Sequence, residues 1–185
     1  MKRSNLILLG ALGAILLFST AFQLTVNRYA HVIENRPKSD TWNSTTRNVD
    51  AFTKVSTDSD ITLVYQKGAE SQLEIKTNVL FLDSITTQVE QGTLKIDVLK
   101  TLKRKDSIAI VITNPTLTSI ALGGESHLIG KDTLKGNRLT LELKEKSSAN
   151  IILDYAKVEY SNTSSGTVNI KGILNQININ NAIKK

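Results

Sequence analysis

The sequence predicts an all-β domain, built as a parallel β-helix or a similar solenoid, that follows one N-terminal transmembrane helix. Three observations predict this arrangement. Residues Leu6–Val26 are uncharged, the segments after Phe52 alternate apolar with polar residues, and the last third of the chain carries a weak repeat of roughly 20 residues. An antiparallel β-sandwich made of hairpins is the chief alternative.

The N-terminal segment has the length and the flanking charge of a membrane anchor. Lys2 and Arg3 precede the uncharged run, and Arg28 ends it. A bilayer core of about 30 Å needs about 20 helical residues, which Leu6–Val26 supplies. Because basic flanks stay in the cytoplasm, the rest of the chain should cross. We therefore expect a single-pass cell-membrane protein with its C-terminal domain in the periplasm or outside the cell.

A cleaved signal peptide is the alternative for the same segment. Ser19-Thr20-Ala21 offers small residues to a signal peptidase, which would cut between Ala21 and Phe22 and leave the protein in the periplasm. The length of the apolar run favours the retained anchor. A buried core helix is disfavoured because the run has no polar face.

These features divide the chain into three predicted parts. Residues 1–27 are the membrane anchor or signal segment, 28–48 are a tether, and 49–185 are the β domain. The tether mixes charges with Pro37 and small polar residues and shows no sustained period. Within it, Tyr29 and Trp42 suit a membrane interface, and Trp42 suits equally the edge of the domain.

The first half of the β domain contains five clear strand patterns. They are Asp60–Tyr65, Leu73–Thr77, Ile85–Val89, Thr93–Val98 and Ile108–Ile112. Gln91-Gly92 predicts a tight turn that joins the third and fourth as a hairpin. The fifth is continuously apolar, which indicates a strand buried on both faces, and Asn114-Pro115 should end it.

The final third repeats a unit of strand, small polar corner and strand. The predicted units are Ser119–Leu122 with corner Gly123–Ser126 and His127–Gly130; Leu139–Leu143 with corner Glu145–Ala149 and Asn150–Leu153; and Val158–Tyr160 with corner Ser161–Gly166 and Thr167–Gly172, before a fourth opens at Gln176–Asn180. The matching strand ends are Leu122, Leu143, Tyr160 and Ile179, which lie 21, 17 and 19 residues apart. Such a period is typical of a β-solenoid.

The order of these segments resembles the autotransporter-adhesin head domain, also called the GIN domain, of Bacteroidetes. The resemblance covers roughly Val49–Asn181 and rests on Phe52–Val55, Ile61–Leu63, Leu73–Ile75, Val89–Ile96, Ile110–Ile120 and the small-residue corners. Relatives often have Ser-Gly-Ser corners, whereas the corner Lys146–Ala149 lacks glycine. The resemblance implies a right-handed β-helical fold in the envelope and no established activity.

Composition excludes several classes of function. With no cysteine, the chain cannot form disulfides, thiolate metal sites or a cysteine nucleophile. The net charge of +6 is not clustered, apart from Lys100–Lys105, which we predict to be a solvated hairpin loop. Aromatic residues make up 5% of the chain, too few for the stacking that single-stranded nucleic acid requires, so no nucleic-acid partner is expected.

No motif indicates catalysis. His31 and His127 are the two histidines, and Glu125 would share a face with His127, as surface pairs commonly do. Asp58-Ser59-Asp60 predicts a turn rather than a calcium loop. Paired carboxylates, a phosphate-binding loop and a Gly-x-Ser-x-Gly elbow are missing. We predict no catalytic, cofactor-binding or metal-binding residues and no cofactor.

These observations predict a membrane-anchored envelope domain that acts as a non-catalytic binding, adhesion or structural module. Its expected partners are the membrane, through the N-terminal helix, and an envelope glycan or protein. The alternative is a polysaccharide-active enzyme of the cell envelope.

Overall fold

The structure is a computed structural model that describes residues 42–99 and 107–180. These residues form twelve strands and one 3₁₀ helix. They are β1 Trp42–Asn48, β2 Lys54–Thr57, β3 Thr62–Lys67, β4 Gln72–Asn78, η1 Val79–Ser84, β5 Ile85–Glu90, β6 Thr93–Val98, β7 Ile108–Asn114, β8 Ser119–Leu122, β9 His127–Gly130, β10 Leu134–Leu143, β11 Ser148–Asn162 and β12 Val168–Asn180. The prediction of an all-β domain is confirmed.

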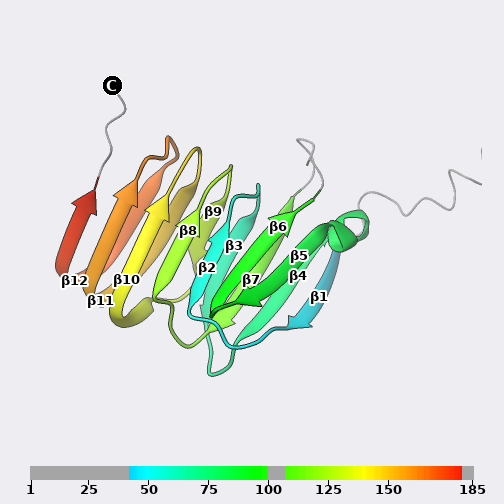
Figure 1. Cartoon of the computed structure of the whole chain (residues 1–185), viewed down its shortest axis with the longest axis horizontal. Helices are drawn as coiled ribbons and strands as arrows, with labels where there is room; N and C mark the ends of the chain where they lie inside the picture. The colour runs from blue at the N-terminus through cyan, green and yellow to red at the C-terminus, as the bar shows by residue number, and fades with distance from the viewer. Residues whose placement is uncertain (1–41, 100–106, 181–185) are drawn as a thin grey trace, which may run out of the picture. The chain divides into compact units, whose positions relative to one another are not determined.

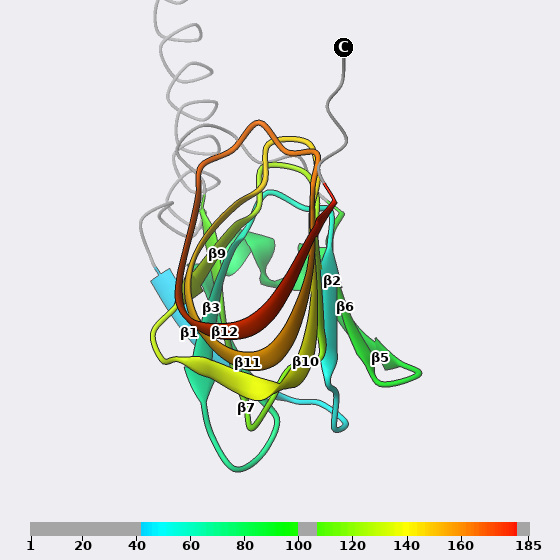
Figure 2. The same cartoon turned by 90° about the vertical axis from the view of Figure 1, so that its left-hand side faces the viewer.

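All twelve strands belong to one sheet, which curls into a half-barrel with two walls (Figures 1 and 2). Wall A contains β1, β4, β7, β3, β9 and the first half of β11. Wall B contains the second half of β11 and then β10, β8, β2, β6 and β5. The long strand β11 therefore bends from one wall into the other, and β12 follows it along its whole length.

The predicted repeat units stack on one another by parallel pairing. Leu122 pairs with Leu143, Leu143 with Asn162, and Ser161 with Asn180, so the steps are 21, 19 and 19 residues. The predicted match of Leu143 with Tyr160 was wrong by two residues, because Tyr160 pairs with Leu141. A shift of two residues keeps every side chain on the same face, so an alternating pattern cannot detect it.

Antiparallel pairing occurs in the described sheet between β1 and β4, β4 and β7, and β5 and β6. The last of these pairs is the predicted hairpin, whose Gln91 and Gly92 have φ of 49° and 72°. Positive φ at both turn residues is what a two-residue type I′ turn requires. A sandwich of antiparallel hairpins is the wrong description of the repeat units, since these pair in parallel.

The core fills the space between the two walls. A buried row crosses wall A. In it, Leu128 pairs with Leu63 on one side and with Ala149 on the other. Val55, Ile120 and Leu141 form the corresponding buried row across wall B. Aliphatic residues at period two along each strand thus become continuous apolar columns, which is the main source of stability in such a sheet.

Two successive corners between the walls contain a residue in the left-handed backbone conformation. Gly124 and Glu145 lie 21 residues apart and both have positive φ, 58° and 57°. At Gly124 a Cβ would lie 2.5 Å from the carbonyl oxygen of Asp58, so that corner needs glycine. The corner without glycine places Glu145 in the left-handed conformation instead, and its Oε2 accepts a hydrogen bond of 2.6 Å from the Gly124 amide.

Strand β1 differs from the prediction, because residues 42–48 were assigned to the tether. The strand has no apolar alternation; it is held by antiparallel pairing with β4. From β1, Arg47 donates hydrogen bonds to the carbonyl oxygens of Leu82 and Ile85 and to Thr87 Oγ1, at 3.0, 2.7 and 3.1 Å. These bonds join wall A to wall B at the N-terminal end of the sheet.

Three other predictions concern residues outside the described ranges. The predicted anchor or signal segment, 1–27, and most of the tether lie there, and so does the Lys100–Lys105 run. The run does not close a hairpin, because β6 pairs with β2 and β5 whereas β7 pairs with β3 and β4. Residues 42–99 and 107–180 form no helix with the length and apolarity of a membrane span.

Candidate binding surface

The outer surface of wall A carries an apolar row at its centre. Val111 of β7 lies opposite Val64 of β3, and Val64 lies opposite Ile129 of β9. The exposed fraction rises along this row from 6% at Val111 to 41% at Ile129. A second outward isoleucine, Ile152 of β11, is 46% exposed. Exposed aliphatic side chains gathered in one area of a surface are a common mark of a contact site.

Polar side chains extend this row in both directions. Beyond Val111 the register continues to Glu74 and Thr46, and beyond Ile129 it continues to Asn150 and Asn169. Asn169 donates a hydrogen bond of 3.1 Å to the Asn150 side-chain oxygen. The row therefore joins an apolar centre to amide groups that can bond a partner.

A parallel row of wall A contains Thr62, His127 and Ser148, which lie opposite one another in that order. Nδ1 of His127 lies 2.5 Å from Ser148 Oγ. The predicted neighbour of His127, Glu125, instead forms an ion pair with Lys146 at the corner, and this contact lowers the pKa of Glu125. Lys146 has the largest effect on Glu125, and His127 adds a smaller charge effect that also lowers the pKa of Glu125.

Wall B presents a different outer surface. One of its rows runs through Lys54, Ser119, Thr140 and Glu159, which are polar throughout. Ion pairs link neighbouring side chains on this wall and its corner: Lys95 with Glu90, Lys144 with Glu142, and Lys157 with Glu159, at 2.5, 3.0 and 3.0 Å. The hydrogen bond from Lys157 lowers the pKa of Glu159. These charges satisfy one another within the chain.

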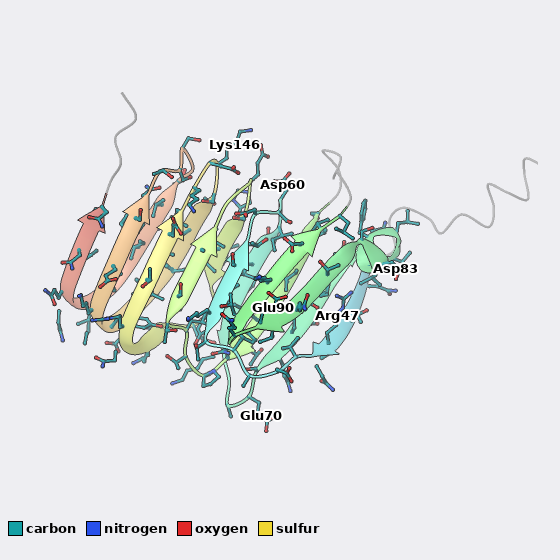
Figure 3. All side chains as sticks on the ribbon, in the orientation of Figure 1. Arg47, Asp60, Glu70, Asp83, Glu90 and Lys146 are labelled. Carbon is teal, nitrogen blue, oxygen red and sulfur yellow. The ribbon has the colours of Figure 1, made fainter. Side chains whose placement is uncertain are left out.

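The predicted turn Asp58-Ser59-Asp60 forms a corner between β2 and β3. Asp60 Oδ1 accepts a hydrogen bond of 2.9 Å from the Glu125 amide, and Ser59 Oγ accepts one of 3.0 Å from the Val98 amide. Figure 3 shows Asp60 and Lys146 at the same edge of the sheet. The Asp60 carboxylate and the Ser59 hydroxyl thus tie this corner to neighbouring segments of the sheet.

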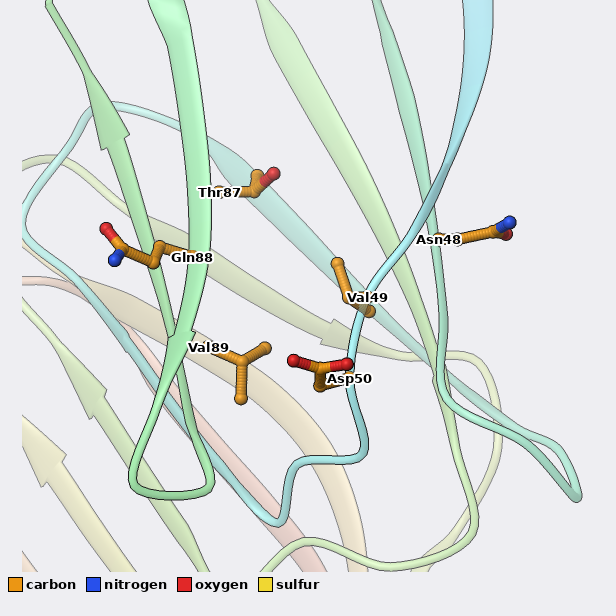
Figure 4. A pocket seen from close by; sticks show the side chains of 6 residues that line it. All are labelled: Asn48, Val49, Asp50, Thr87, Gln88 and Val89. Atoms are coloured by element: carbon orange, nitrogen blue, oxygen red, sulfur yellow. The ribbon is translucent and has the colours of Figure 1, made fainter.

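A shallow pocket of about 370 Å³ lies where β1 ends beside β5 (Figure 4). It is lined by Asn48, Val49, Asp50, Thr87, Gln88 and Val89. Asp50 is its one ionisable side chain, so the pocket brings no pair of acids together. Over the ranges that the structure describes, no group of three His, Cys, Asp or Glu residues is placed to hold a metal ion.

The sequence analysis did not single out the apolar row, although a signal for it was present. In Leu128-Ile129 and Ile151-Ile152 two adjacent residues are apolar, which interrupts the alternation. Adjacent residues of a strand point to opposite faces, so the second member of each pair must point outwards. Only the pairing of β9 with β3 shows that one of these side chains, Ile129, continues a row with Val64.

The chain has structural neighbours among solved proteins. A "putative adhesin" from Bacteroides fragilis is 22% identical with a TM-score of 0.63, over 71% of this chain and 62% of that one. Another from Parabacteroides distasonis is 14% identical with a TM-score of 0.66, over 78% and 64%. A "putative lipid binding protein" from P. distasonis is 16% identical with a TM-score of 0.63, over 77% and 63%. The chain thus spans less than two thirds of each of these three proteins.

At these identities the neighbours show a shared fold and nothing about ligands. No significant match is found among curated proteins. The family model described as "Putative auto-transporter adhesin, head GIN domain" matches residues 51–183, which include every described strand after β1. The chain therefore belongs to the family of the head GIN domain.

Proposed function

We propose that this protein is a non-catalytic binding module of the cell envelope and that the outer surface of wall A contacts the partner. The observation that carries the proposal is the row Val111–Val64–Ile129, which is apolar, lies on a regular sheet and is continued by Asn150 and Asn169. A partner would cover the exposed aliphatic groups and bond the amides. The family description as an adhesin head is consistent with such a role.

The partner is a macromolecule of the envelope, either a protein or a glycan. An extended chain laid across wall A would cross several strands and meet the apolar row together with hydroxyl and amide groups. Wall B is less suited, because its outward rows are polar, whereas wall A, which also carries the ion pair Lys76–Glu74, exposes Ile129 and Ile152.

The proposal includes the placement of the domain. Residues 1–27 hold the chain in the cell membrane and 28–41 act as a tether, so that the curled sheet, a short parallel β-helix, faces the periplasm or the exterior. The support is the apolar run with its basic flank. N-terminal sequencing of the mature protein tests this directly. A mature chain that begins at Phe22 would show that the segment is a cleaved signal peptide and not a retained anchor.

The experiment for the binding surface replaces Ile129 by Lys in the full-length chain. A lysine at this exposed position disrupts the apolar row without opening the core. We expect recovery of envelope partners after chemical crosslinking to fall at least tenfold. The matched control is Thr140→Lys on wall B, which also adds one charge at an exposed strand position. Equal recovery from both variants and the native protein would contradict the proposal.

A further inference from the structure

Strand β12 closes the described sheet at its C-terminal end with an edge that few features protect. It is 13 residues long and, among the described strands, it pairs with β11 only. A free edge carries backbone N–H and C=O groups that can pair with another strand, and proteins guard such edges with charges, prolines or very short strands. β12 has no proline, and Lys171 is its one ionisable residue.

The inner surface of β12 is apolar and incompletely covered. Ile177 and Ile179 lie opposite Val158 and Tyr160 of β11, so they point towards the core side. Val158, one repeat unit earlier, is fully buried, whereas Ile177 is 42% exposed and Ile179 is 55% exposed. One more strand stacked on β12 would cover both isoleucines.

The strand is self-complementary about its middle. Read forwards from Val168 and backwards from Ile179, the residues match in kind: Val168 with Ile179, Asn169 with Asn178, Ile170 with Ile177, and Lys171 with Gln176. The pairing with β11 places Val168 and Ile170 on the core side, opposite Ala149 and Ile151. The apolar matches therefore face inwards in both arms of the strand, and the polar matches face outwards.

We propose that β12 is a dimerisation edge, on which the β12 strand of a second copy of this chain pairs antiparallel. Two identical strands related by a twofold axis run antiparallel, so residue i meets residue j and j meets i. In the register that sets Ile170 opposite Ile177, residues 168–171 of one copy, which lie on wall A, pair with residues 176–179 of the other copy, which lie on wall B. Lys171 then faces the neutral Gln176, and no like charges meet.

This register makes a test with cysteines possible, because the chain contains none. In the double variant Asn169→Cys/Asn178→Cys, each cysteine of one copy lies opposite a cysteine of the other, at the Cα separation of about 4.5–5.5 Å found across antiparallel pairs. We expect mild oxidation of the full-length chain in membranes to give a disulfide-linked dimer. Its yield should exceed that of either single variant at least tenfold.

Two further variants separate this register from chance collisions. Lys171→Cys/Asn180→Cys places outward cysteines about four residues out of register, so it should crosslink no better than the single variants. Adding Ile179→Glu to the first double variant should lower the dimer yield at least tenfold, because a carboxylate would enter the new apolar contact. Ile179 is more than half exposed, so the domain itself should keep its fold.

The proposal is overturned if the Asn169→Cys/Asn178→Cys chain stays monomeric under these conditions, or if its yield matches that of the out-of-register pair. Crosslinking of these cysteines to a different protein would also overturn it, since the edge would then belong to another partner. Asn169 also continues the apolar row of wall A, so Ile129→Lys is the variant that separates the two proposals: it should leave the dimer yield unchanged.

Discussion

The two walls of the sheet share one core but differ in what they present to solvent. Wall A exposes Ile129 and Ile152 beside amide and hydroxyl groups and the ion pair Lys76–Glu74, whereas the outward rows of wall B are polar and contain the pairs Lys95–Glu90 and Lys157–Glu159. The difference arises at single positions, since both walls are built from the same alternating strands. In a fold of stacked units, the outward residues can therefore specialise one wall for contact while the inward residues stay alike.

The comparison predicts that the interior does not distinguish the walls. Leu63 of wall A and Ile120 of wall B are both fully buried. Replacing either by alanine should lower the free energy of unfolding by about 2–5 kcal/mol, the cost of a large cavity in a packed core. Chemical denaturation of both variants checks this. A loss of less than about 1 kcal/mol in one variant alone would show that the walls do not share a core.

Arg47 tests the connection between the walls. Arg47→Ala removes three hydrogen bonds that reach Leu82, Ile85 and Thr87 and should lower the unfolding free energy by about 2–3 kcal/mol. Lysine at this position should recover less than half of the loss, because one ammonium group cannot form the same set of hydrogen bonds as the planar guanidinium of arginine. Full recovery with lysine would indicate that charge alone matters. Denaturation midpoints of the two variants decide between these outcomes.

Alkaline pH should weaken the bend between the walls through Tyr155. Its hydroxyl is buried and donates a hydrogen bond of 2.6 Å to the carbonyl oxygen of Leu117, and burial raises the pKa of Tyr155 from 10.0 to about 12. The raised pKa favours the protonated folded form, so this stabilisation is complete below pH 10 and is lost as the pH rises towards 12. The loss should be about 2–3 kcal/mol.

Tyr155→Phe provides the control for that pH dependence. The variant should be less stable than the native protein at pH 8, because it lacks the hydrogen bond, but its stability should fall less steeply between pH 10 and pH 12. Thermal unfolding across this range measures both slopes. Identical slopes would show that another group controls the alkaline transition.

The smallest effect is expected on the outer surface of wall B. Glu159→Gln removes the charge that pairs with Lys157 at the sheet surface. Exposed ion pairs contribute little, so the unfolding free energy should change by less than about 1 kcal/mol. A larger change, measured by chemical denaturation, would mean that the pairs of wall B hold the fold together rather than covering its surface.

Much of the fold could be predicted from the sequence, because the alternation of apolar and polar residues indicates which segments form strands, and small polar residues mark the corners. Ser119–Leu122 and His127–Gly130 coincide with β8 and β9. The strand register was harder to predict, as the two-residue error at Tyr160 shows. A shift by two residues keeps the same side chains on the same face, so the apolar alternation does not detect it. β1 was missed because its pairing with β4, and not its own polar sequence, holds it in place.

The candidate surface could not be predicted from sequence for a related reason. Val64, Val111 and Ile129 are 18 to 65 residues apart and meet only through parallel pairing of distant strands. Asn114 is another case: it is buried, and its side-chain amide donates a hydrogen bond of 2.8 Å to the carbonyl oxygen of Phe52. Along the sequence it reads only as the residue before a proline that ends a strand.

Site-specific photocrosslinking tests the assignment of the contact surface to wall A most directly. A photoreactive side chain would replace Asn150 on wall A or Thr140 on wall B, both exposed strand residues, in the full-length chain in its native envelope. The proposed role predicts that position 150 captures a defined partner at several times the yield of position 140. Equal yields, or preferential capture at position 140, would contradict the assignment of the binding surface to wall A.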